Sequence, residues 1–129
     1  MPDAIPLFAN PDHVTAIANA AGIVGKRFVK YVAGSSMSLL RVELAGAGDT
    51  PAGVAAHDVE QGEALHLITH DHIPVTAGED LAVGDLVAVG ADGKAVKAAA
   101  ATEDGPAQRP VGIVAVAGAS GADAGIFLY

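Results

Sequence analysis

The sequence predicts a mainly β protein: a small barrel or sandwich of short antiparallel strands that follows an extended N-terminal arm. Three observations predict this class. Glycines recur so often that the strands between them can be only about five residues long, which is the usual length in a small sheet protein. Apolar and polar residues alternate between the turns, as in half-buried strands. Finally, three prolines fall within residues 1–12, which excludes a helix interior there.

We expect residues 1–12 to form the arm and residues 13–129 to form a single β-rich domain. Large apolar residues lie in the arm beside a proline, in the order Ile5, Pro6, Leu7, Phe8. A free tail would expose them to water, so one interpretation is an arm that docks on a neighbouring protein. The other is an arm that folds back on its own barrel.

The segment 12–32 is open to two interpretations. Asp12 could cap a helix, and several apolar residues after it fall at helical spacing. However, Gly22 and Gly25 interrupt that pattern, and the segment is rich in β-branched residues, which favour strands. We therefore expect a strand, a turn and a second strand.

From residue 39 onward the alternation is clearer. In the sequence LLRVEL, residues 40, 42 and 44 are apolar, whereas Arg41 and Glu43 between them are charged. An Asp-Gly turn at 91–93 predicts a hairpin, and 102–110 reads as a polar loop. Further short strands are expected at 53–57, 64–69, 72–76, 85–90, 94–98, 111–117 and 125–129.

An internal echo links two parts of the chain. The stretches that begin at Pro51 and Pro110 each read as a short apolar strand, a loop around a glycine and a second apolar strand. At one common spacing Gly53 matches Gly112, and Gly62 matches Gly121. Frequent Gly, Ala and Val would also produce such a match, so the echo supports two similar hairpins in one barrel or sandwich.

Composition and charge bear on the partners of the protein. Fifteen acidic residues against seven scattered basic residues give a formal net charge of −8, so direct binding of nucleic acid is not expected. The exception would be a fold that gathers the basic residues of 26–41 on one face. The chain has no cysteine, which removes disulfides and thiolate chemistry and suits a cytosolic origin. No signal peptide and no membrane span are expected.

Three histidines are the candidate metal ligands. In a strand His70 and His72 would share one face, and His66 lies four residues earlier. No further ligand follows at a defined spacing, and solvated histidines beside a turn explain the pattern better. We therefore expect no metal and no cofactor.

The sequence also gives little evidence for catalytic residues. Pairs of acids such as Glu79 and Asp80 lie in glycine-rich loops, where carboxylates stay hydrated. The serines lie outside a nucleophile-elbow motif, and the glycine-rich run 118–125 lacks the lysine of a phosphate-binding loop. The chain is therefore predicted not to be an enzyme.

The order of these pieces resembles the small capsid decoration, or cement, proteins of tailed bacteriophages. The resemblance rests on a Gly-Val-Ala strand at 53–55, on a hairpin over 77–94, and on a closing strand at 112–114. The turn residues that carry it are Gly53, Gly78, Gly84, Asp85, Gly93 and Gly112. One departure is the His-Asp-His sequence at 70–72, where such proteins more often have a glycine-containing turn.

The resemblance implies a barrel-like or β-tulip-like protomer that forms a homotrimer. It implies a place on the outer surface of the virion, where the protein, made in the host cytoplasm, binds the major capsid protein at the junctions of its subunits and stabilises the head. The arm residues would then contact the capsid.

Two other functions stay open. One is a small barrel that binds a metal or ligand through His66, His70 and His72. The other is a small domain that shapes a substrate channel in a larger enzyme, because Gly-Asp-Leu-Val hairpins also occur in β-clip folds.

Overall fold

The computed structural model describes residues 13–19, 22–36, 39–69, 71–99 and 109–129. The described residues form strands and one short 3-10 turn, η1, at Ala91–Gly93. The strands are β1 (His13–Ala18), β2 (Phe28–Tyr31), β3 (Arg41–Leu44), β4 (Gly53–Ala55), β5 (Ala64–Ile68), β6 (Asp71–Thr76), β7 (Leu86–Val89), β8 (Ala95–Lys97), β9 (Gly112–Val116) and β10 (Asp123–Leu128). The prediction of a mainly β protein with a barrel is thus confirmed, and residues 13–18 are a strand rather than a helix. In the described part of the chain no helix has the length and hydropathy to cross a bilayer.

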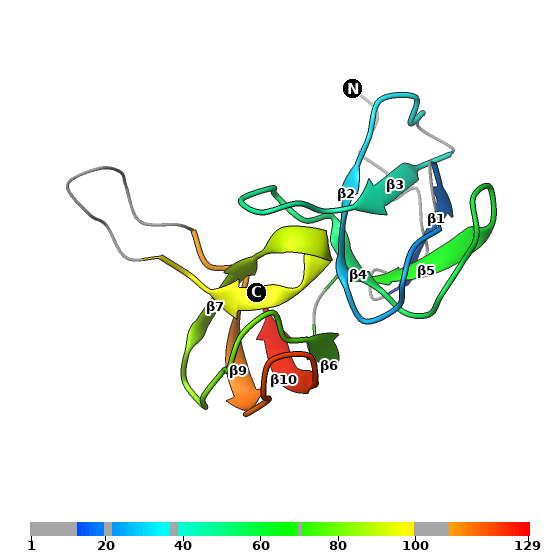
Figure 1. Ribbon diagram of the computed structural model, residues 1–129. Coiled ribbons are helices and arrows are strands. Elements are labelled where there is room, and N and C mark those ends of the chain that lie inside the picture. The colour runs from blue at the N-terminus through cyan, green and yellow to red at the C-terminus, as the bar shows by residue number, and fades with distance from the viewer. Residues whose placement is uncertain (1–12, 20–21, 37–38, 70, 100–108) are drawn as a thin grey trace, which may run out of the picture.

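The first five strands close into a barrel in the order β1-β3-β2-β4-β5 (Figure 1). β1 pairs antiparallel with β5 and parallel with β3. This parallel pair departs from the expected antiparallel arrangement. It forms because β2 lies between β1 and β3 in the chain and returns the backbone to its first direction, as a parallel pair requires.

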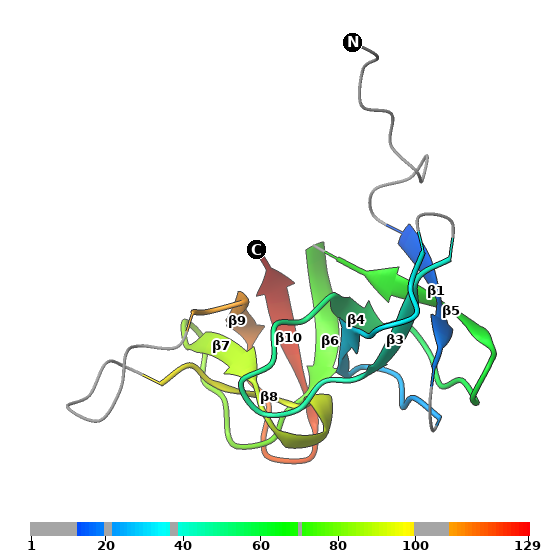
Figure 2. The ribbon, with the colours of Figure 1, turned by 90° about the horizontal axis from the view of Figure 1, so that it is seen from above.

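The last five strands form a second sheet in the order β6-β10-β9-β7-β8, seen beside the barrel in Figure 2. Ala77, just after β6, makes a parallel bridge to Ala95 at the start of β8. That bridge occupies the place of the parallel β1–β3 pairing in the barrel. The two sheets therefore have the same strand connections.

Hydrogen-bond register shows that the second unit, residues 71–129, repeats the first unit, residues 13–69. Gly62 and Gly121 have φ of 84° and 85°, and their N–H groups donate to the carbonyl oxygens of Ala18 and Ala77 at 2.8 Å. Corresponding pairs are Val54↔Ile68 with Ile113↔Phe127, Ala55↔Leu67 with Val114↔Ile126, and Val29↔Gly53 with Val87↔Gly112. The sequence echo is therefore a structural duplication that includes all five strands of each unit.

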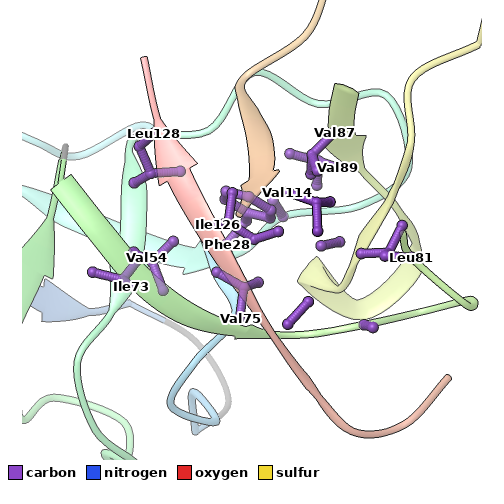
Figure 3. Close-up of a cluster of buried hydrophobic side chains, with 14 residues drawn as sticks. Phe28, Val54, Ile73, Val75, Leu81, Val87, Val89, Val114, Ile126 and Leu128 are labelled. Atoms are coloured by element: carbon purple, nitrogen blue, oxygen red, sulfur yellow. The ribbon is translucent and has the colours of Figure 1, made fainter. Parts of the chain in front are cut away.

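The inward-facing residues of each unit form its core. In the first unit Val29, Val42 and Leu67 are fully buried in one cluster. The cluster of the second unit also takes in Phe28, Ala45 and Val54 from the first unit. In Figure 3 Phe28 lies beside Ile126, and Val54 lies beside Ile73. The two units thus share a continuous apolar contact.

Candidate interaction surface

The chain enters the described structure at β1, where His13 pairs with Ile68 of β5. The predicted binding residues Ile5, Pro6, Leu7 and Phe8 lie outside the described residues. Their contact with a partner stays a prediction.

Four predicted turn residues of the second unit, Gly78, Gly84, Asp85 and Gly93, lie in the segments that connect its strands. The Asp85 carboxylate accepts the N–H of Ala82 at 2.9 Å and so closes the turn before β7, and Gly84 there has φ of 90°. The N–H of Gly78, after β6, donates to the carbonyl of Ala95 at 2.7 Å. Gly93 ends the turn between β7 and β8.

Two predicted turn glycines begin strands instead. Gly53 is the first residue of β4 and Gly112 is the first residue of β9. A Cβ on Gly53 would lie 2.8 Å from the carbonyl oxygen of Ile68 in the neighbouring strand. Close approach of two backbones, rather than a turn, accounts for glycine at this position.

Two of the three candidate metal ligands, His66 and His72, lie among the described residues. His66 lies on β5 of the first unit, where its ring meets that of His57 edge to face with centroids 6.2 Å apart. His72 lies on β6 of the second unit, and His70 is outside the described residues. Among the described residues no group of three or more His, Cys, Asp or Glu side chains could hold a metal ion.

The His-Asp-His sequence at 70–72, which departs from the glycine-containing turn of the phage proteins it resembles, includes a residue with an unusual backbone conformation. Asp71, at the start of β6, has φ of 90°, a conformation that favours glycine. Its carboxylate accepts the N–H of His72 at 2.8 Å. An aspartate whose side chain accepts the N–H of the following residue thus adopts a glycine-type conformation here.

A groove of about 440 Å³ opens where the two units meet. Its lining includes Phe28 and Gly53 from the first unit and Val89 and Leu128 from the second. The lining contains one acidic side chain, Asp49, and one basic side chain, Arg109, together with the hydroxyl group of Tyr129. The groove between the units is thus lined by both apolar and polar side chains, the latter including Thr50 and Thr69.

One ion pair joins the two units, and two more lie within the first unit. Lys26 of the first unit pairs with Asp123 of the second at 2.8 Å, and the hydrogen bond to that carboxylate raises the pKa of Lys26. Within the first unit Lys30 pairs with Asp49 at 3.0 Å and Glu43 at 3.6 Å. Since surface pairs of this kind contribute little stability, the Lys26–Asp123 pair orients the units more than it holds them together.

Sequence reasoning missed an exposed apolar row on the second unit. Leu86, Ile113 and Phe127 stand side by side across β7, β9 and β10. Leu86 is 45% and Phe127 is 49% exposed. We call these three residues the outer row. The last strand could have indicated this row, because Phe127 points to the face opposite Ile126 and Leu128. Since both faces of that strand are apolar, the sequence does not show which face is exposed.

Comparison with known proteins adds to this geometry. A family model described as phage cement protein matches residues 9–128. The chain belongs to the phage cement protein family. Among solved structures, the chain is similar to the head fiber gp8.5 N base of bacteriophage phi29, with 23% identity, a TM-score of 0.70, and coverage of 91% of this chain and 92% of that one. That likeness shows the fold. Comparison with curated protein sequences gives no match.

Proposed function

We propose that this cement-family chain is a structural virion protein that binds the outer surface of an assembled phage head. It binds the major capsid protein where capsid subunits meet, acts as a homotrimer, and stabilises the head without catalysis. The observation that carries the proposal is the match of the cement family to residues 9–128.

The shape of the described chain supports this function. The first five strands close into a barrel, which removes their edges, so this unit resists unwanted pairing with other chains. The exposed residues on that frame include several large apolar ones, such as Phe127 and Tyr129, which suit burial against a neighbour.

In this proposal residues 1–12 bind the capsid. An apolar segment with several prolines can occupy a groove or add a strand to a partner's sheet at low entropic cost. Three arms on one trimer would bind together, and linked binding raises the overall affinity by about 10²–10⁴-fold over one arm.

The test is co-sedimentation with undecorated heads of the phage that encodes the chain. Deletion of residues 2–12 should leave a folded protein, since no described strand includes them, yet should abolish sedimentation with heads. A matched variant that keeps the length of the arm but replaces Ile5, Leu7 and Phe8 by serine should lose binding as well. Unchanged binding by the deletion variant would remove the arm from the mechanism.

A further inference from the structure

The arm, residues 1–12, is attached to the frame beside the groove between the two units. His13, the first residue of β1, pairs with Ile68, the last residue of β5. Because the two strands are antiparallel, the start of β1 and the end of β5 lie at the same end of the barrel. Thr69, which follows β5, belongs to the lining of the groove. The arm is therefore joined to the described chain next to one wall of the groove.

The length of the arm allows it to enter this groove. An extended backbone covers at most about 3.5 Å per residue, so Phe8 can lie up to roughly 17 Å from His13, and Ile5 up to roughly 28 Å. The groove has a volume of about 440 Å³, which is in the range of pockets that enclose small ligands. It can therefore hold a few side chains of a segment that is tethered beside it.

The lining offers apolar surface to such a segment. Pro51, Ala52, Pro110 and Val111 belong to the lining and are only partly buried. The apolar residues in 5–8 of the arm would be exposed to water in a free tail. Contact between the two removes apolar surface from water on both sides, which stabilises the docked form.

The polar groups of the lining suit an occupant that is itself polypeptide. The hydroxyl groups of Thr50 and Tyr129, two exposed residues of the lining, can donate to peptide carbonyl oxygens. On the side of the arm, Pro6 has no N–H group that would need an acceptor. These partners lower the cost of taking the peptide groups of the arm out of water.

Charge also favours the arm as the occupant. In the lining Asp49 is already compensated, because Lys30 pairs with it at 3.0 Å and the N–H of Gly46 donates to it at 2.8 Å. Among the described residues no carboxylate forms an ion pair with Arg109, the basic residue of the lining. Residues 1–12 contain two aspartates and no lysine or arginine. The groove thus presents a cation to a segment that carries only acidic side chains.

We propose that, in the unbound protein, residues 1–12 dock in the groove between the two units of their own chain. Ile5, Leu7 and Phe8 lie on the apolar part of the lining, and Asp3 lies near Arg109. For a head to bind the arm, the arm must first leave the groove, and this consequence rests on the proposed function. Because apparent affinity scales with the fraction that is competent to bind, a groove that holds the arm nine-tenths of the time weakens head binding about tenfold.

Nuclear magnetic resonance on the free protein tests the docking without heads. The chain has no cysteine, so Ala4→Cys places one nitroxide label in the arm. The amide signal of Val111, in the groove lining, should be broadened, whereas that of Val116, at the other end of β9, should change little. The labelled chain with serine at positions 5, 7 and 8 should lose this difference. Equal broadening of the two signals, or the same difference in the serine variant, would overturn the proposal.

A mixed sample separates docking in the groove of the same chain from docking on another copy. It combines isotope-labelled chain without nitroxide and nitroxide-labelled chain without isotope. Docking within one chain predicts that Val111 is broadened less in the mixture than in the doubly labelled chain. Broadening that is as strong in the mixture would place the arm on a neighbouring copy and overturn the proposal.

Blocking the groove tests the competition with heads. Thr50→Trp puts a large side chain into the groove from an exposed position of its lining, and Ala47→Trp, exposed in the same loop but outside the lining, is the matched control. Thr50→Trp should lose the broadening of Val111 and bind undecorated heads more tightly, whereas Ala47→Trp should behave like the unmodified chain in both measurements. Circular dichroism verifies that both variants are folded.

The two measurements keep this proposal distinct from the proposed function. Unchanged broadening of Val111 in Thr50→Trp, or head binding no tighter than that of Ala47→Trp, would overturn competition between the groove and the head. Heads that bind none of the chains, while Val111 is broadened as expected, would contradict the capsid function and support docking of the arm in the groove.

Discussion

Gly93 shows how a single residue joins the two units. Its φ is 71°, and a Cβ there would overlap the carbonyl oxygen of Phe28. Gly93→Ala should therefore lower the free energy of unfolding by about 3 kcal/mol, through backbone strain and displacement of Phe28 together. Gly121→Ala is the matched control, with φ of 85° but nothing within 4 Å of the added carbon, and should cost only about 1 kcal/mol. Urea unfolding measures both, and equal losses would mean that the contact with Phe28 contributes nothing.

Asp49 gives the fold a defined acid dependence. The N–H of Gly46 and the ammonium of Lys30 bind its carboxylate and lower the pKa of Asp49. Because the folded pKa lies below the unfolded one, the stabilisation is complete above the unfolded value of about 4 and is lost as pH falls through the folded value. Asp49→Asn keeps an oxygen acceptor but has no charge to titrate.

Near neutral pH the unmodified chain should therefore have a higher urea midpoint than Asp49→Asn, and we call the difference the gap. The gap should narrow as the pH falls below about 4, where the carboxyl of the unmodified chain becomes protonated. A gap of constant size across that range would show that the charge of Asp49 plays no part.

At the scale of the element, β2 serves both units. Val29 faces the core of the first unit, whereas its neighbour Phe28 lies in the core of the second. Phe28→Ala should cost about 3–5 kcal/mol, the usual range for a buried phenylalanine, and should destabilise both units at once. Phe127→Ala, at the corresponding side of β10 but 49% exposed, should have a small effect on the monomer.

The expected unfolding is accordingly one transition for residues 13–129, in agreement with the single domain predicted from the sequence. Fluorescence of tyrosine, present in both units at Tyr31 and Tyr129, and far-ultraviolet circular dichroism should give the same midpoint. Separate transitions for the two probes would show that the units unfold independently.

Much of the element order could be read from the sequence, because short-range rules decide it. The alternation around Val42 and the Asp-Gly turn at 91–93 placed strands and a hairpin where the structure has them. β10 begins at Asp123, two residues before the predicted start, because Asp123 pairs with Thr76 across the sheet, which is a long-range fact.

Features of the whole molecule were harder to predict, since they depend on contacts distant in sequence. The parallel pairing of β1 with β3 needs the barrel to close. The burial of Phe28 and Val54 on the outside of the first barrel needs the second unit. The echo of Gly53 in Gly112 indicated two similar hairpins, but only strand register extends the repeat to every strand.

At the scale of the whole molecule the described chain is a duplicated β frame, and we propose that it acts by binding a phage head. The most direct measurement is a saturation experiment, in which purified chain is added to undecorated heads of its own phage and the copies that sediment per head are counted. We expect saturable binding, and heads that withstand a higher temperature once saturated. Heads that sediment without the chain, or that rupture at the same temperature when saturated, would contradict it.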